Sequence, residues 1–501
     1  MRMKYSCLSF FRLPKIVLFI LLFNLFRLGY GQEIASKIDQ KDLKDFIKTL
    51  SSIQFEGRAV DNDGQIKTQH FIVDRFKTLQ IEPFYHDGYL ENFTLKQTDK
   101  TEVFLKTQNH QILKNFDRMM FTDDIPPIKV IESQVVFGGY ATEDELNQIE
   151  VENRLVLVLS VNPSELFPIT KRLEARKAAG LIVFHDDDKP FEATKSYFNE
   201  VHFKKKYAIA DGHEPNVFDS YPSETHFLNA FIIPEAEVIN VMGWPKNKLV
   251  SLANRKKIKM APPANIEIHF EQVEKTIETA NVVGGIRGES EQVIILSAHY
   301  DHVGVDGNVY YPGADDNASG VAALLELAEE FVQCDQLKYS MIFLATSAEE
   351  GGLLGSSYHV NNPEFDADKV VCNINMDMIS RCDNKQSDCN YLYCIGNNLT
   401  ETLDSLIREA DNRVLGCMCD YSENNTGIFA RTDGANFSKK GIPSILFFTG
   451  FHDDYHKPTD TMEKIDFDLL ENRILLISEV IKLIQRTPNP IRKPINTTIP
   501  E

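Results

Sequence analysis

Basic residues are scarce in this sequence of 501 residues, in which 53 Lys and Arg stand against 73 Asp and Glu, for a formal net charge of −20. Proteins that bind nucleic acid need a basic surface, so this charge argues against a nucleic-acid partner. Internal repeats and long low-complexity segments are also missing. Hydrophobic residues make up 43% of the chain, as in ordinary globular proteins, and the length allows two or three domains.

Long apolar runs are missing as well, except near the N-terminus. The run Ile16 to Phe26 has only 11 residues, which is too short to cross a bilayer comfortably, and basic residues precede it. Gly29 and Gly31 are small residues that suit cleavage before Gln32. We therefore predict a signal peptide over residues 1–31, with an uncleaved anchor as the alternative, and a soluble secreted or periplasmic protein.

Cysteine is infrequent, with eight residues in the whole chain, of which Cys7 would leave with the signal peptide. The paired C-x-x-C spacing is absent, which argues against a cysteine-bound zinc site. An exported protein can form disulfides, so one or two bridges are expected, although the sequence leaves their pairing open. The candidates form two groups: Cys382, Cys389 and Cys394, and Cys417 and Cys419.

Five asparagines fit the pattern for N-glycosylation, which applies only in a eukaryotic secretory route. They are Asn92, Asn398, Asn424, Asn436 and Asn496.

The first half of the chain predicts two amphipathic helices and then a small α/β segment. The helices are expected over Lys41–Leu50 and Gln65–Leu79. The segment is expected to hold strands over Val130–Phe137, Arg154–Leu159 and Leu181–Phe184, and a short helix over Leu173–Ala179. We interpret its polar residues His213, His226 and Asp186–Asp188 as solvated surface.

The second half alternates apolar strands with helices, which indicates a covered sheet. Strands are expected over Ile266–Phe270 at a sheet edge and over Val282–Ile286, Val293–Ala298, Met341–Thr346, Val371–Met376, Tyr391–Ile395 and Pro443–Phe448. Helices are expected over Val321–Phe331, Thr400–Ala410 and Phe467–Gln485. The predicted fold class is α/β, with a mixed, largely parallel sheet flanked by helices and a smaller inserted α/β module. We expect the main domain over 32–118 and 262–490, the insert over 119–261 and a loose tail over 491–501.

Acidic and imidazole side chains follow several of these strands at the point where each strand ends. His299 and Asp301 follow the strand Val293–Ala298, and Asp315 and Asp316 precede the next helix. Glu349 and Glu350 come just after a third strand, Asp377 directly follows a fourth, and His456 lies in the loop after the last. Each has an ordinary explanation alone, such as a helix cap, but together they predict a divalent-cation site at one sheet edge.

The motifs AHYDHVG, PGADDNASG, TSAEEGGLLGS, NMDMI and DYHKPTDT resemble those of the M28 zinc peptidases, a family that includes aminopeptidases. Glu56-Gly57-Arg58 resembles an early EGR element of exported members. The insert, with VFGGYA and NRLVLVL, is similar to a protease-associated domain. The resemblance implies the zinc aminopeptidase (phosphorylase/hydrolase-like) fold, two Zn²⁺ ions and peptide substrates.

The resemblance also implies a role for each site residue. Asp315 would bridge the two metals, His299 and Asp377 would complete one site, and Glu350 and His456 would complete the other. Glu349 would be the general base, and Asp301 would orient the imidazole of His299. The peptide bond between Asp315 and Asp316 would be cis, as in the family.

The sequence departs from the family at Thr432-Asp433-Gly434, where members often carry Ser-Asp-His, and this puts the adjacent pocket wall in question. We expect His302, His359 and His452 to be local or surface residues and not ligands. The loop Cys417–Gly427 lies where the family lines its substrate pocket.

These observations favour an exported dizinc exopeptidase, an aminopeptidase first. The alternatives are a glutaminyl cyclase of the same fold with one zinc, a carboxypeptidase that acts on acidic C-termini, and a non-catalytic receptor-like ectodomain. Retention of all expected ligands argues against the last. The sequence leaves side-chain specificity and oligomeric state open.

Overall fold

The computed structural model describes most of the chain between residues 38 and 491. The described ranges are 38–85, 88–99, 102–107, 112–113, 117–119, 130–160, 166–185, 205–210, 230–233, 235–271, 274–362, 364–386, 388–396, 401–414, 418–420, 426–487 and 491. Outside these ranges lie the expected signal peptide, nearly all of the C-terminal tail, Asp186–Asp188, His213, His226, Cys417, Asn398, Asn424 and Asn496. Within them, no helix is long and apolar enough to cross a membrane.

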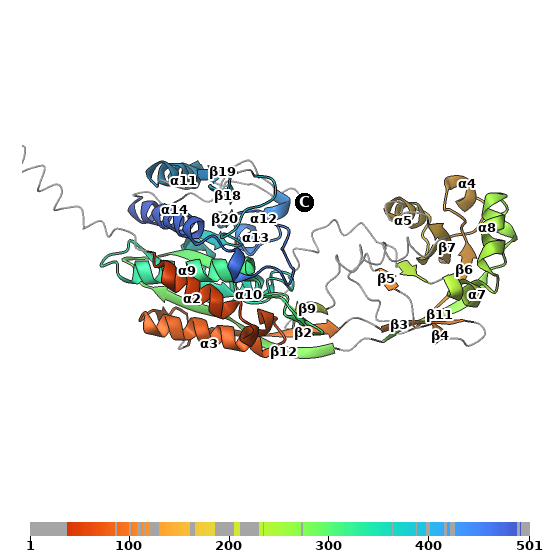
Figure 1. Ribbon diagram of the computed structural model, residues 1–501, viewed down its shortest axis with the longest axis horizontal. Coiled ribbons are helices and arrows are strands. Elements are labelled where there is room, and N and C mark those ends of the chain that lie inside the picture. The colour runs from red at the N-terminus through yellow and green to blue at the C-terminus, as the bar shows by residue number, and fades with distance from the viewer. Residues whose placement is uncertain are drawn as a thin grey trace, which may run out of the picture.

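A large mixed sheet forms the centre of the molecule (Figure 1). Its order is β19 (Met418–Asp420), β18 (Tyr391–Ile395), β20 (Ser444–Phe448), β17 (Val370–Met376), β13 (Ser290–His299), β16 (Tyr339–Thr346), β12 (Glu274–Ile286), β2 (Leu90–Asp99) and β9 (Lys205–Ile209), and the short β1 (Glu82–Pro83) also pairs with β12. The four neighbours β20, β17, β13 and β16 are parallel. From β16 to β9 every pairing is antiparallel. At the other end, β18 pairs antiparallel with β20 and parallel with β19, so the sheet is mixed.

Helices cover both faces of this sheet, which explains the continuous apolar runs of its central strands. Alternate residues of β13 point to opposite faces: Ile294 and Leu296 join one apolar cluster, and Val293 and Ile295 join another. The first face carries α2 (Gln40–Leu50), α3 (Asp63–Thr78), α9 (Gly320–Val332), α11 (Glu401–Arg413) and α14 (Phe467–Arg486). The second face carries α10 (Leu354–Asn361) and α13 (Gly434–Lys439).

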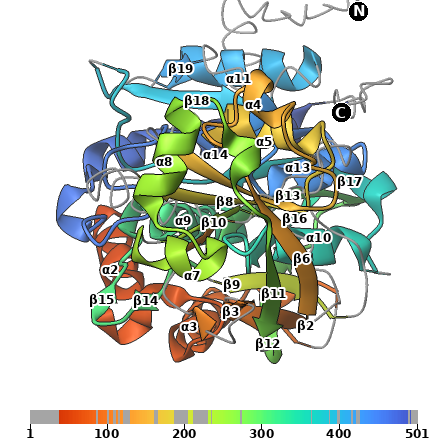
Figure 2. The ribbon, with the colours of Figure 1, turned by 90° about the vertical axis from the view of Figure 1, so that its right-hand side faces the viewer.

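A second sheet forms a separate unit with its own core (Figure 1), and this unit faces the viewer in Figure 2. Its order is β4 (Ile112–Leu113), β3 (Glu102–Thr107), β11 (Ala264–Glu271), β6 (Val130–Phe137), β7 (Leu155–Ser160), β8 (Gly180–His185), β10 (Ala230–Ile232) and β5 (Asp117–Met119). One face packs on α4 (Glu143–Leu146) and α5 (Leu166–Glu174). The other packs on α7 (Val238–Met242) and α8 (Lys246–Asn254).

Several strands belong to a different sheet from the one that their sequence position suggests. The chain enters the second sheet at β3 and leaves it after β11, so the strand around Ile266–Phe270 is not an edge of the main sheet. Conversely, β9 comes from the middle of the expected insert and pairs with β2 of the large sheet. An alternating pattern identifies a strand, but it does not name the strand's partner.

Most expected elements are present at the predicted places, but the helix expected over Leu173–Ala179 is shifted. It is α5, which spans Leu166–Glu174, and the chain then turns into β8 at Gly180. Leu173 is fully buried against the second sheet, as expected for the apolar face of a helix. It lies near the end of α5 and not at the start of a helix, which is why the predicted bounds were shifted.

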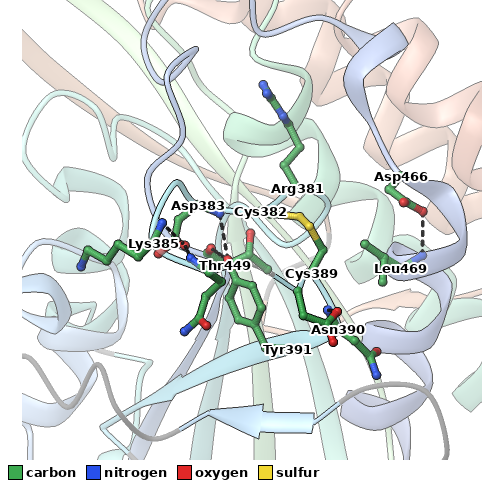
Figure 3. The surroundings of a disulfide bond; sticks show 12 residues. Arg381, Cys382, Asp383, Lys385, Cys389, Asn390, Tyr391, Thr449, Asp466 and Leu469 are labelled. Carbon is green, nitrogen blue, oxygen red and sulfur yellow. Dashed lines mark hydrogen bonds between the residues drawn. A yellow bond between two sulfur atoms is a disulfide. The ribbon is translucent and has the colours of Figure 1, made fainter.

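One disulfide joins Cys382 to Cys389 within a short loop after β17 (Figure 3). Nearby, the buried Arg473 of α14 donates hydrogen bonds to the carbonyl oxygens of Ile379, Arg381, Cys389 and Tyr391. Of the remaining described cysteines, Cys334, Cys372 and Cys419 are free thiols, and Cys394 is not part of a disulfide. Of the five expected bridge partners, one pair is therefore confirmed, and Cys394 and Cys419 are not bridged.

Two of the glycosylation patterns fall on described residues. Asn92 is exposed on β2, whereas Asn436 is buried in α13 and donates to the carbonyl oxygen of Leu353 and the hydroxyl of Ser356. A glycan needs an accessible side chain, so only Asn92 of these two meets that requirement.

The N-terminal segment is tied to the large sheet by one buried arginine. Arg58 lies at the end of the helical turn η1 (Ile53–Arg58) and donates to the carbonyl oxygens of Leu50, Tyr300, Pro312, Gly313 and Asp316. Its pKa is lowered to about 10 by burial, so it remains charged at neutral pH.

The neighbouring Gly57 cannot be replaced easily. It has a positive φ of 62°, and a Cβ there would lie 2.4 Å from the carbonyl oxygen of Gly304. The EGR element therefore serves to bring the Arg58 guanidinium into the loops that follow β13.

We predict that Arg58→Ala lowers the free energy of unfolding by about 3–5 kcal/mol, because several buried carbonyls lose their donor at once. Arg58→Lys should recover only part of the loss, since an ammonium group cannot reproduce the fork of donors. Urea denaturation followed by circular dichroism measures both. The exposed Arg486→Ala serves as the control and should change stability by less than about 0.5 kcal/mol. A loss no larger than the control's would contradict this account.

Candidate metal centre

The candidate site lies at the carboxyl ends of the four parallel strands, where loops from separate parts of the chain meet. His299 is the last residue of β13, and Asp377 directly follows β17. Glu349 and Glu350 occupy the turn between β16 and α10, and His456 lies in the loop after β20. Asp316 lies in the helical turn η6 (Ala314–Ser319), just before α9.

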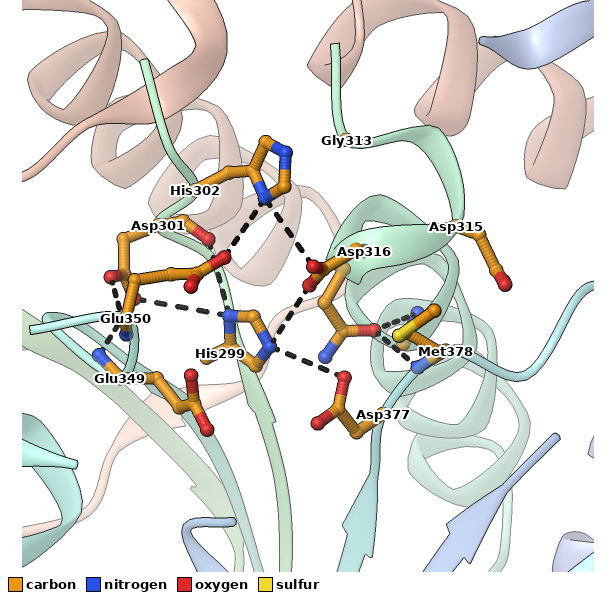
Figure 4. Close-up of polar contacts among 12 residues, drawn as sticks. His299, Asp301, His302, Gly313, Asp315, Asp316, Glu349, Glu350, Asp377 and Met378 are labelled. Atoms are coloured by element: carbon orange, nitrogen blue, oxygen red, sulfur yellow. Dashed lines mark hydrogen bonds and ion pairs between the residues drawn. The ribbon is translucent and has the colours of Figure 1, made fainter. Parts of the chain in front are cut away.

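One half of the site joins His299, Asp316 and Asp377 (Figure 4). The Nε2 atom of His299 lies 3.2 Å from Asp377 Oδ1 and 3.5 Å from Asp316 Oδ1. Its Nδ1 lies 3.1 Å from the carbonyl oxygen of Asp301. A carbonyl can only accept, so Nδ1 carries a proton, and in the neutral ring the lone pair of Nε2 faces the two carboxylates.

The other half joins Asp316 to Glu350 and two imidazoles. His456 Nε2 lies 3.1 Å from Asp316 Oδ2 and 3.0 Å from Glu350 Oε2. His302 Nδ1 lies 3.0 Å from Glu350 Oε1 and 3.6 Å from Asp316 Oδ2. The ring of His456 also stacks on Tyr455, with ring centroids 3.8 Å apart. Asp316 is thus the one carboxylate that both halves share.

Asp315, which we expected at the centre, points away from the cluster (Figure 4). Its Oδ1 accepts hydrogen bonds from the backbone N–H and the hydroxyl of Ser380, and its Oδ2 lies 3.2 Å from Nε2 of His452. The cis peptide bond is also one residue later than expected, between Asp316 and Asn317. The register of the turn therefore turns Asp316, and not Asp315, toward the histidines.

Asp301 is buried beside the site, but its carboxylate acts differently from our expectation. It accepts hydrogen bonds from the backbone N–H groups of Glu349 and Glu350, at 3.0 and 3.2 Å. Its own main-chain oxygen, and not the carboxylate, holds the imidazole of His299. Asp301 therefore orients His299 through the backbone and fixes the turn that carries both glutamates.

The turn that carries Asp316 is held from behind by Asp460. This buried carboxylate accepts hydrogen bonds from the backbone N–H groups of Asp315 and Asp316. The side chain of Asn317 donates to the carbonyl oxygen of Met376 and accepts from the N–H groups of Gly320 and Met378. These contacts connect η6 to β17 and to the loop after β20, so the three ligand-bearing loops are mutually fixed.

The charges in this cluster do not balance among themselves. Burial, together with Asp377 and Asp433, raises the pKa of Glu349 well above its usual value. Although burial alone would lower it, the pKa of His299 is raised well above its usual value by Glu349 and Asp377. Although burial alone would raise it, the pKa of Glu350 is held well below its usual value by His456 and His302. A bound cation would offset the repulsion among the buried carboxylates of the cluster.

A pair of divalent cations fits these residues. The atoms of His299, Asp316 and Asp377 lie within 4.8 Å of one another, as do those of His302, Asp316 and Glu350. Asp316 Oδ2 is buried without a hydrogen-bond partner, as expected for an oxygen that coordinates a metal. Imidazole and carboxylate ligands suit zinc, and a shared carboxylate between two halves is typical of two-metal sites.

A third acidic group, Asp42, Glu326 and Glu329, also lies within metal-ligand distance. The guanidinium of Arg75 already binds Asp42 and Glu329 there. This group is therefore an ion-pair cluster on the helices of the first face.

A pocket opens beside the cluster, and Glu349 lines it together with His299, Asp316 and Asp377. Its other wall is largely apolar. That wall comprises Leu353, Met378, Ile428, Leu446, Phe448, Phe451 and Tyr455, with Arg431 and Thr432.

Sequence reasoning gave the central position to Asp315 in place of Asp316, and it did not place His302 in the site. The side chain of His302 is buried in the cluster, contrary to the expectation of a local or surface residue. The only sequence signal for it is its position three residues after His299. His359 and His452 are buried too, against Glu91 and Asp315 respectively, away from the cluster. Gly434 packs on Phe429 and Ser444, so the pocket wall in question is made by Arg431 and Thr432 instead.

Residues 281–481 match the sequence model of Peptidase family M28. Leucine aminopeptidase 1 of Pyrenophora tritici-repentis is 28% identical over 206 residues, which cover 38% of this chain and 51% of the relative. A probable leucine aminopeptidase of Arthroderma otae is 26% identical over 226 residues, which cover 42% and 60%. The chain thus spans between half and two thirds of the length of these curated relatives.

Two solved structures share the fold over nearly the whole chain. The aminopeptidase from Aneurinibacillus sp. strain AM-1 aligns with a TM-score of 0.55 and 19% identity, and covers 92% of this chain and 97% of that one. The zinc aminopeptidase BSAP from Bacillus subtilis aligns with a TM-score of 0.55 and 15% identity, and covers 92% and 98%. The matched region 281–481 contains every residue of the candidate metal centre. Residues 281–481 are therefore similar to peptidase family M28.

Proposed function

We propose that this protein is an exported dizinc aminopeptidase that removes N-terminal residues from peptides. The observation that supports it most is the position of Asp316 between two ligand groups, with His299 and Asp377 on one side and Glu350 and His456 on the other. Two cations a few ångström apart repel each other, and a shared carboxylate offsets that repulsion. The similarity to leucine aminopeptidases supports the reaction class.

Zinc bound there would polarise the scissile carbonyl and lower the pKa of water. The proposed role of Glu349 is that of general base, because its carboxylate lines the pocket beside the ligands. It takes a proton from the attacking water and returns it to the leaving amine. The backbone of Glu349 is held by Asp301, which keeps the base in place during both transfers.

His302 is proposed to orient Glu350, since its Nδ1 lies 3.0 Å from Oε1 of that carboxylate. The proposed export rests on the N-terminal run of basic and then apolar residues, which is typical of a signal peptide.

The proposed function predicts a defined substrate pattern. Peptides with a free amino terminus should be hydrolysed, and the same peptides with an acetylated amino terminus should not. A chelator should abolish turnover, and added zinc should restore it, with two zinc ions per chain by elemental analysis. Preference for a peptide's C-terminal bond would instead indicate a carboxypeptidase, and cyclisation of N-terminal glutamine with one zinc would indicate a glutaminyl cyclase.

Replacement of the proposed base tests the mechanism. Glu349→Gln keeps the size of the side chain but cannot accept the proton, so kcat should fall by about 10²–10⁴ while zinc content stays the same. The exposed Glu364→Gln, which lies outside the pocket lining, is the matched control and should keep full activity. Near-normal turnover of Glu349→Gln would assign the base to another group.

Two neighbouring aspartates allow a direct test of the shared ligand. Asp316→Asn should reduce binding of both zinc ions, since an amide cannot offset two cations. Asp315→Asn should keep two zinc ions per chain but lower stability by about 1–3 kcal/mol, because its amide group would face the donors of Ser380 or His452. Metal content measured after dialysis separates the two variants. The reverse pattern would return Asp315 to the centre of the site.

A further inference from the structure

The pocket beside the metal centre has one permanently cationic side chain at its wall. Its other lining residues are the ligands, Glu349, Thr432 and apolar groups, and Arg431 is the one Lys or Arg among them. The guanidinium carbon of Arg431 lies 5.9 Å from the centroid of the Phe451 ring. Phe451 is itself 38% exposed, so the pair stands at the edge of the pocket and not in the core.

The base of the Arg431 side chain is fixed by its surroundings. Its backbone N–H donates to the carbonyl oxygen of Ile428, in the turn that follows α12 (Thr426–Phe429). The next two residues, Thr432 and Asp433, are buried, and Asp433 accepts a hydrogen bond from Thr346 at the end of β16. The main chain at Arg431 is therefore attached to the same strand that leads to Glu349.

The guanidinium itself has no carboxylate within ion-pair distance among the described residues. Other arginines near the site differ in this respect. Arg381 binds Asp454 and lies 3.5 Å from Asp460, and Arg58 donates to backbone carbonyls. A guanidinium offers five donors in a planar fork that matches a carboxylate, and the Phe451 ring stabilises its plane. At Arg431 this fork lies at the wall of the pocket, and no carboxylate of the described residues occupies its donors.

The charge of the pocket agrees with this assignment. The carboxylates of the centre face its proposed cations, so they do not compete for a guanidinium at the edge. An apolar wall accepts the aliphatic part of a bound residue. A single charged group at that wall, here the guanidinium of Arg431, then distinguishes substrates by their charge. This is the pattern expected when one polar group determines specificity in an otherwise apolar pocket.

We propose that Arg431 binds a carboxylate of the substrate, so that the enzyme prefers short or acidic peptides to neutral ones. The carboxylate comes either from an acidic side chain or from the C-terminus of a short peptide, because both present the same planar acceptor. This inference rests on the proposed peptidase function, and Arg431 is a specificity-determining residue and not part of the proton transfer.

The test compares three peptides that share an N-terminal leucine: Leu-Ala with a free C-terminus, Leu-Glu amide and Leu-Gln amide. Wild-type enzyme should show a kcat/KM about tenfold higher for one or both carboxylate peptides than for Leu-Gln amide. Arg431→Gln should remove that preference mainly through KM, and leave Leu-Gln amide within about twofold. If only Leu-Ala loses its higher kcat/KM in this variant, the carboxylate is that of the C-terminus. If only Leu-Glu amide loses it, the carboxylate is that of the acidic side chain.

Two further variants complete the experiment. Arg431→Glu should reverse the preference, so that Leu-Lys amide becomes a better substrate than Leu-Glu amide. Arg486→Gln, an exposed arginine at the end of α14, is the matched control and should behave as wild type. An unchanged ratio of carboxylate to neutral substrates in Arg431→Gln would overturn the proposal while leaving the peptidase function intact.

If the Arg431 variants fail to fold, the wild-type protein provides an independent measurement. The preference for carboxylate peptides should fall as the salt concentration rises from 50 to about 500 mM, because an exposed charge pair is screened. A wild-type enzyme without any such preference at low salt would contradict the proposal. Absence of hydrolysis of all peptides by the zinc-loaded wild type would instead contradict the proposed function.

Discussion

The structure depends on the burial of several carboxylates around Asp316, at the carboxyl ends of the parallel strands of the large sheet. Asp316 is 2% exposed, and its two oxygens face different imidazoles, those of His299 and His456. Buried like charges are costly unless a cation compensates them, and the histidines alone do so incompletely. The arrangement therefore persists because the surrounding fold holds these groups in place, and it gives a reason for the site to bind divalent metal.

Three buried charged residues support this centre through hydrogen bonds to the backbone of its loops. Arg58 donates to the carbonyl oxygen of Asp316, Asp460 accepts from its N–H group, and Asp301 accepts from the N–H groups of the Glu349–Glu350 turn. Each therefore fixes a loop and leaves the ligand side chains free to face one another. Precise sites need this kind of support, because loops that drift by an ångström lose their ligand geometry.

The segment between the strands of the second sheet also reaches the centre, through β9 of the large sheet. Ile209 of that strand packs in one cluster with Ala348 and Leu354, on either side of the glutamate turn. The ring of Tyr207 lies so close to Gly351 that a Cβ there would stand 3.1 Å from it. The strand that returns from the inserted unit therefore forms part of the wall behind Glu349 and Glu350, and the two units share structure and not only a linker.

Much of this organisation follows from the sequence, because strands buried on both faces are apolar throughout and amphipathic helices repeat every 3.6 residues. The runs Val293–Ala298 and Met341–Thr346 predict two central strands, and the polar residues that follow them indicate the edge of the sheet where the site forms. The sequence also determined which residue types gather there, since parallel strands must bring their carboxyl ends to one side. His299, Glu349, Glu350, Asp377 and His456 could be selected on this ground.

Only the tertiary structure decided between Asp315 and Asp316, because the two are adjacent and identical in type. The path of one turn sends the first toward Ser380 and His452 and the second toward the cluster. The same holds for His302, whose burial depends on loops far away in the chain, and for the pairing of β9 and β11 with their sheets. A local pattern specifies what a segment is, whereas its neighbours depend on long-range packing that no short stretch encodes.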